Sequence, residues 1–549
     1  MSSLLTRYFS ILLCLTVLFG CSTIVSIVPE DDDSPLAITK SSVADLGRDS
    51  LFYYTDEACW IKPQADPYKF IYFQTAATQY FSECKTTSLK KSEISPTHYA
   101  LIVYPKSESE VNRIMNIDGI KISYIPFGYS PVSDDEVPIS LKTNASQLEF
   151  RKHTNSATNM PVMYVVWPIN ISIPDDIDFH IEYDAFIPDY TNLNEFEFEE
   201  LLCIEKRAIE IATSNESGEC SRGQSYRTLH ALIKNNDNLL GSPVPVGNLK
   251  IRVQYGLNII DNYTQSDGSV TVSGTINDNA SVYIVYENDR WRISRKGSLF
   301  AYSLLLGKLT DIWPYNSFVY SQTQTHSYLT VHRAANYFFH DNPFLSAPQT
   351  NYSIRINMSE VVAADSYFTF VLGSPKIEIS DFWANNSGYY FSNAIHELGH
   401  FYHYLLKGSN YSSYDSVHKL IKESFAEFVT WCLSRYYYTQ LNGGVYNTSW
   451  DNPLHGLRQI WLPTDSSYYS PLFIDLMDDY NQYEERPPIH TYNNDQISDM
   501  PFMAITNIAV QNNNWDSVKN ALLSKVGIYF TFSEYNTYIA PYNTYFSSN

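Results

Sequence analysis

The sequence carries little positive charge for its length. Its 549 residues include 37 Lys and Arg against 59 Asp and Glu, which gives a formal net charge of −22. Proteins that bind nucleic acids neutralise phosphates with basic surfaces, so this balance argues against a nucleic-acid partner. A chain of this length is expected to hold several domains rather than one.

Long apolar runs are absent after residue 20. Residues 1–20, MSSLLTRYFSILLCLTVLFG, carry one arginine ahead of an apolar run that is short for a membrane span, which predicts a signal peptide. The run ends in L-F-G-C, which resembles a bacterial lipobox. The resemblance implies export, lipidation of Cys21 and anchoring to the outer membrane, with residues 21–48 as a flexible tether. An ordinary secretory signal is the alternative.

Cysteine is scarce, at 7 residues. In an oxidising compartment the local pairs Cys59–Cys84 and Cys203–Cys220 are candidate disulfides, although sequence alone leaves the connectivity open. Cys432 falls on the apolar face of a predicted helix, and we expect a buried free thiol there.

Patterns along the chain predict a multidomain α+β protein. Residues 49–190 alternate strand-like runs with the helical stretch SESEVNRIMN, which predicts a small α/β or α+β domain. Residues 191–243 read as a helical connector. Residues 244–298 hold several short strands and resemble a compact, transthyretin-like β-sandwich. Residues 299–549 are expected to be largely helical, beginning with LFAYSLLLGKL and HSYLTVHRAANYFFHD, with strands at YSIRINM and KIEIS.

The stretch HELGHFYHYLLKG, residues 396–408, holds two histidines four residues apart. One helical turn separates such positions, so His396 and His400 can point at the same ion. Glu397 lies about 100° round the helix, where a carboxylate can hold a metal-bound water without ligating the metal. Ser392 is the expected N-cap, and Gly408 is the expected residue just past the helix end.

A second helix is predicted in DSVHKLIKESFAEFVTWCLSRYYYTQLNGG, with Asp415 as its cap. Glu423 and Glu427 share one face of it. A catalytic zinc takes three protein ligands and keeps one position open, and two histidines with one glutamate form a known set. Glu423 is the candidate third ligand and Glu427 a hydrogen-bond partner for a ligand imidazole. Taken alone, the pair could equally be a solvated charged face.

HELGH followed by ESFAE resembles the gluzincin class of zinc metallopeptidases, in which a glutamate on a following helix completes HExxH. The resemblance implies a Zn²⁺ ion held by His396, His400 and Glu423. It also implies that Glu397 is the general base and that Glu427 acts from outside the ligand set.

Two related patterns are missing. The metzincin pattern needs Gly at 403 and His at 406, where this chain has His403 and Leu406, so His403 is not expected to be a ligand. The G-x-M-E-N signature of related aminopeptidases is not found, which leaves an endopeptidase as the expectation. The order of the regions resembles lipoproteins of the Bacteroides group that end in an HExxH domain.

These features predict an exported zinc peptidase that hydrolyses extracellular or host proteins or glycoproteins through zinc-activated water. Tyr468, Tyr469 and His490 are candidates for stabilising the developing oxyanion, and the sequence does not choose among them. The gluzincin resemblance also implies an edge strand before the HExxH helix that pairs with an extended substrate, and KIEIS, residues 376–380, is the candidate. The alternative is a glycan- or protein-binding lipoprotein whose peptidase domain is vestigial.

Overall fold

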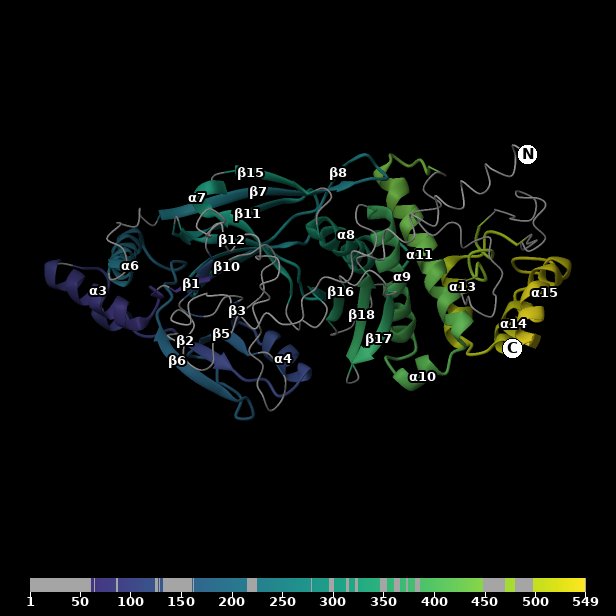
Figure 1. The fold of residues 1–549 in the computed structure, drawn as a ribbon, viewed down its shortest axis with the longest axis horizontal. Helices are drawn as coiled ribbons and strands as arrows, with labels where there is room; N and C mark the ends of the chain where they lie inside the picture. Colours follow the sequence, from purple (N-terminus) through teal and green to yellow (C-terminus); the bar gives the residue numbers. More distant parts are fainter. Residues whose placement is uncertain are drawn as a thin grey trace, which may run out of the picture. The chain divides into compact units, whose positions relative to one another are not determined.

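The protein is a mixed α+β, multidomain chain with several separate β-sheets (Figure 1). The fold is that of a computed structural model. The residues described are 61–63, 65–84, 87–123, 127, 129–131, 160, 162–214, 225–277, 279–295, 301–312, 315–320, 324–345, 353–359, 366–371, 374–380, 386–447, 470–478 and 497–548. All of them belong to the unit Phe52–Asn549.

An antiparallel sheet with two α-helices forms the N-terminal part, and the strand order is β3-β5-β2-β6. Its elements are α3 (Phe70–Glu83), η1 (Lys91–Glu93), β2 (His98–Val103), α4 (Glu108–Met115), β3 (Lys121–Ser123), β5 (Met163–Pro168) and β6 (Phe179–Ala185), beside the short pair β1 (Ile61–Pro63) and β4 (Tyr129–Pro131). The apolar run of β5 is buried between its two neighbours. Ser107 caps α4 by accepting a hydrogen bond from the Glu110 amide, so this predicted helix is confirmed.

The helix predicted within the connector 191–243 is confirmed as α6 (Glu195–Ser214), which packs against α3, but the later part of that range is not helical because it holds the strand β7 (Ser225–Asp237). Two four-stranded sheets follow α6. One has the order β10-β9-β12-β14, and the other has β11-β7-β15 with β8 beside β7. Their strands are β7 (Ser225–Asp237), β8 (Ser242–Pro245), β9 (Lys250–Tyr255), β10 (Asn258–Tyr263), β11 (Ser269–Ile276), β12 (Ser281–Val285), β14 (Ser303–Lys308) and β15 (Tyr315–Tyr320).

The strands expected in residues 244–298 form, but the sheets are not confined to that stretch. β7, β14 and β15 join them from outside it, and β13 (Trp291–Arg295) leaves to pair with β16. LFAYSLLLGKL was expected to be helical, and that prediction is wrong because its core is β14, followed only by the short α7 (Leu309–Ile312). A short leucine-rich run is compatible with either a buried strand or a helix. Here it forms a strand because it pairs with β12.

The sheet nearest the histidine motif has the order β13-β16-β18-β17 (Figure 1). β16 (Ile354–Ser359) and β18 (Ser374–Ser380) run parallel, and β17 (Tyr367–Val371) is antiparallel to β18. The prediction that KIEIS is an edge strand is therefore wrong, since β18 lies between β16 and β17. Its alternating charges mimic a half-exposed strand, but Lys376 and Glu378 form an ion pair and are largely buried.

Helices make up most of the remaining C-terminal part. They are α8 (Gln324–Asn336), the π-helical turn Tyr337–Asp341, α9 (Ser387–Leu406), α10 (Tyr411–Asp415), α11 (Lys419–Leu441), α13 (Phe502–Gln511), α14 (Trp515–Leu523) and α15 (Phe532–Ser548). α9 contacts β17 and β18 and packs along α11 (Figure 1).

Both motif helices form, but their expected N-caps are wrong. Asn386 caps α9 through the Tyr389 amide, while Ser392 lies inside the helix. His418 caps α11 through the Leu420 amide, and Asp415 instead ends α10. The C-terminal signal of α9 is confirmed, because Gly408 follows the helix with a φ of +75°.

Cys84, Cys203 and Cys432 are free thiols, and Cys432 is buried as predicted. Cys21, Cys59 and Cys220 lie outside the described residues, so the lipobox is untested, and neither expected local disulfide is present at Cys84 or Cys203. Within the described part of the chain, no helix combines the length and the apolar character that a membrane span requires.

Candidate metal centre

The centre lies where α9 and α11 come closest. A Cβ added at Gly399 would stand 3.1 Å from the Ala426 Cα and 3.3 Å from the Val429 Cβ. Real Cβ contacts are rarely that short, so the glycine of HELGH allows the two backbones to approach. The close approach of α9 and α11 at Gly399 therefore brings Glu423 on one helix within reach of the histidines on the other.

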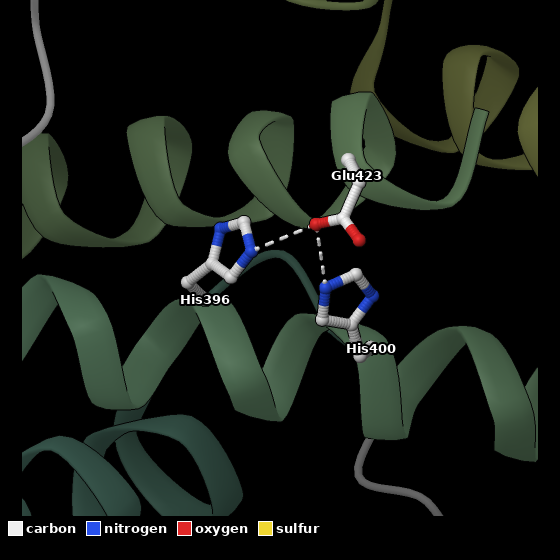
Figure 2. A group of neighbouring side chains, drawn as sticks. All are labelled: His396, His400 and Glu423. Atoms are coloured by element: carbon white, nitrogen blue, oxygen red, sulfur yellow. Dashed lines mark hydrogen bonds and ion pairs between the residues drawn. The ribbon is translucent and has the colours of Figure 1, made fainter. Parts of the chain in front are cut away.

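His396, His400 and Glu423 converge on one point (Figure 2). The two imidazoles extend from α9, and the Glu423 side chain reaches toward them from α11. Glu423 Oε2 lies 3.4 Å from His396 Nε2 and 3.1 Å from His400 Nε2, and the three donor atoms all fall within 4.8 Å of one another. Ligands about 2.1 Å from a tetrahedral ion stand about 3.4 Å apart, so the group could hold a metal ion.

The outward-facing nitrogen of each histidine lies close to a polar side chain, at ion-pair distance for His396 and at hydrogen-bond distance for His400. His396 Nδ1 lies 3.5 Å from Glu427 Oε1, and Glu427 is almost fully buried. His400 Nδ1 lies 3.1 Å from the Tyr414 hydroxyl. A donor or acceptor on Nδ1 fixes the ring orientation and leaves Nε2 for the ion, which is the usual support of a metal-ligating histidine.

Charge at the site favours a cation. Burial alone would lower the pKa of His396, but the carboxylates of Glu427, Glu397 and Glu423 raise it above its ordinary value. Burial would raise the pKa of Glu423, but His400 and His396 hold it well below its ordinary range. The same negative field that holds a proton on the histidine would hold a divalent ion between the three side chains.

Glu397 is 3% exposed and lies beside the metal-ligand group without belonging to it. It lines a cavity of about 600 Å³ together with His400 and Glu423. β17 supplies one wall of that cavity, and α10 with the start of α11 supplies the other: the remaining lining residues are Ser366, Tyr367, Phe368, Thr369, Phe370, Tyr411, Tyr414, Asp415, Lys419 and Lys422. A molecule in the cavity would therefore meet both the ion position and a carboxylate.

Three other predicted site residues, Tyr468, Tyr469 and His490, lie outside the described residues, so their expected role remains a prediction. His403 is fully buried against Tyr414 and Phe425, and burial lowers its pKa well below the ordinary value. It is a neutral core residue of α9, and it is not part of the group that could hold a metal ion.

Tyr414 is the contact that sequence reasoning missed. It lies 14 residues after His400, on the short helix α10 that folds back over α9. Burial, with Glu423 and Glu397 nearby, raises its pKa well above the ordinary value, so the hydroxyl stays protonated. Helical periodicity carries no signal for a contact made across a turn, which is why the spacing alone did not reveal it.

Replacing Tyr414 with Phe should weaken metal binding by about 10-fold to 100-fold, because such indirect partners typically contribute that much. The ring itself, packed on Phe368, is retained. The measurement is zinc affinity by competition with a chromogenic chelator. Tyr411→Phe is the matched control. Tyr411 lies on the same short helix and lines the same cavity, but among the described residues its hydroxyl makes no hydrogen bond with the three proposed metal ligands. Equal affinities for the two variants would remove Tyr414 from this role.

In comparisons with known proteins, the chain matches no protein-family model and no curated protein.

Proposed function

We propose that the chain is a zinc-dependent endopeptidase of the gluzincin type. The observation that carries the proposal is the group of His396, His400 and Glu423, which opens onto a cavity that Glu397 also lines. Among the described residues, three side chains with metal-ligating atoms converge here and no fourth joins them. A structural zinc site closes with four side chains, whereas a catalytic one keeps a position open, so three ligands beside a cavity favour catalysis.

The chemistry of the donors supports zinc. Two imidazole nitrogens and one carboxylate suit Zn²⁺, whereas Ca²⁺ and Mg²⁺ prefer shells of oxygen ligands. The donor separations of 3.1 and 3.4 Å also suit a compact tetrahedral ion. Zinc bound there would act as a Lewis acid on a carbonyl and would lower the pKa of a water molecule.

Glu397 has the central role among the chain's own residues. Its carboxylate accepts the proton of the water that attacks the substrate carbonyl carbon, and it returns that proton to the amide nitrogen as the carbon–nitrogen bond breaks. The side chain is 3% exposed, so bulk water competes little for the proton. Glu427 and Tyr414 hold the two histidine rings in place while this happens.

The walls of the cavity support an extended peptide as the substrate. Among the described strands, β17 pairs only with β18. The N–H and C=O groups on its other edge make no strand pairing with any described strand. Residues Tyr367 to Phe370 of this strand line the cavity. A peptide added to that edge would run past Glu397 with its backbone hydrogen-bonded, which recognises peptides without fixing their sequence.

Metal removal tests the proposal directly. The zinc-loaded chain should cleave internal bonds in a library of peptides blocked at both ends, and chelation by 1,10-phenanthroline should abolish cleavage. Adding back one equivalent of zinc should restore it, because the three ligands are carried by two packed helices rather than by loops. Mass spectrometry identifies the bonds cut. A zinc-loaded chain that cuts no peptide would instead favour a binding protein with a vestigial site.

A further inference from the structure

Two free thiols lie at the contact between α3 and α6, far along the sequence from the metal centre. Cys84 directly follows α3, and Cys203 lies in the middle of α6. Both are partly exposed. The two helices lie side by side in the N-terminal part (Figure 1), and their polar contacts locate the two thiols relative to each other.

An ion pair fixes one side of this contact. Arg207 Nη2 lies 2.6 Å from Glu83 Oε2, and Glu83 is the residue before Cys84. Arg207 is one helical turn beyond Cys203, on the same face of α6. The Cys84 backbone is therefore held next to the turn of α6 that begins at Cys203.

Backbone hydrogen bonds fix the other side. Glu200 accepts hydrogen bonds from the Ser88 amide at 2.9 Å and the Leu89 amide at 2.7 Å. Glu200 lies three residues before Cys203, again on the same face of α6. Cys203 is thus flanked by the two anchors on α6, and Cys84 lies between the same two anchors on the opposing segment.

Tyr80 lies at the same contact between the two helices. Its ring lies 5.7 Å from the Arg207 guanidinium, and the Cys84 amide donates to the Tyr80 carbonyl at 3.0 Å. Its pKa is raised to about 12, first by burial, then by a hydrogen bond with the Cys84 thiol and by the charges of Cys84, Glu200 and Cys203. The phenol therefore pairs with the Cys84 thiol on one side and stacks on the Arg207 guanidinium, one turn from Cys203, on the other.

We propose that Cys84 and Cys203 form a disulfide that joins α3 to α6. With a small-molecule disulfide such as oxidised glutathione as the oxidant, the two thiols lose two protons and two electrons, and two molecules of glutathione are released. This pairing replaces the local pairs expected from the sequence, in which each of these cysteines had a different partner. The cross-linked loop of chain contains all four strands of the N-terminal sheet, because β2, β3, β5 and β6 lie between the two cysteines in the sequence.

Mapping the disulfide tests the pairing on the full chain. Purified protein is incubated with oxidised glutathione, remaining thiols are alkylated, and trypsin digestion proceeds without reduction. A tryptic site lies between each neighbouring pair of the four cysteines 59, 84, 203 and 220, so each falls on its own peptide. We expect one linked species joining the peptides of Cys84 and Cys203. Links from Cys84 to Cys59 or from Cys203 to Cys220, or alkylation of both thiols, would overturn the proposal.

Stability gives a second measurement. Cys84→Ser and Cys203→Ser should each lower the thermal midpoint of the oxidised protein by about 3–10 °C, because a cross-link over a long loop restricts the unfolded chain. The double variant should fall no further, since either change removes the same bond. All forms should converge in reducing buffer. Additive losses, or losses that persist under reduction, would show that the cysteines act separately.

Discussion

Replacing Glu397 with Gln is expected to lower peptide turnover by about 10²-fold or more while leaving zinc content unchanged. The amide keeps the size and hydrogen-bonding reach of the side chain but cannot accept the proton of the attacking water. A positioned general base typically contributes about 10²–10⁴ in rate. Glu397 is not one of the three residues whose donor atoms converge, so the ion should remain bound.

The experiment requires zinc analysis, thermal unfolding and cleavage kinetics on the same preparation. Glu397→Asp is the matched variant, because it keeps a carboxylate but shortens the side chain by one methylene, and we expect its activity to lie between the parent and Glu397→Gln. Full zinc content with undiminished cleavage in Glu397→Gln would exclude Glu397 from the reaction. A large loss of zinc would instead assign it to the ligand set.

Sequence could anticipate the metal-ligand group because its spacing is local. The four-residue interval between His396 and His400 becomes one helical turn wherever a helix forms. Glu423 and Glu427 are likewise one turn apart, so one helix places both. The sequence could only assume that the two helices pack with these faces together, and the close approach at Gly399 makes that contact possible.

Pairing between strands was not predictable in the same way. The family resemblance implied that KIEIS is an edge strand, but β16 and β17 flank it, Asn357 of β16 donates to Glu378 at 3.2 Å, and Lys376 forms an ion pair with Glu378. Charges that pair inside a sheet are invisible to a pattern that treats every charge as exposed. The hydrogen bond between Tyr414 and His400 was missed for a similar reason, because Tyr414 lies on α10, outside both sequence motifs.

Glu423→Ala should abolish stoichiometric zinc binding, whereas Glu427→Ala should keep most of it. Glu423 Oε2 lies within 3.4 Å of both ligand nitrogens, so its loss removes one of three donors. Glu427 lies 3.5 Å from the far nitrogen of His396 and outside the group of three donors, and losses of that kind typically cost about 10–100-fold in affinity. We expect the loss at Glu423 to exceed that range.

Thermal unfolding with and without chelator makes this comparison independent of activity. An ion that binds only the folded state raises the midpoint, and the increase grows with affinity. The parent should therefore lose stability on chelation, Glu427→Ala should lose less, and Glu423→Ala should not respond. Elemental analysis after dialysis gives the zinc content of the same samples. If Glu427→Ala proved unresponsive while Glu423→Ala behaved like the parent, Glu427 would be the ligand, because an unresponsive midpoint with no retained zinc identifies the side chain that holds the ion.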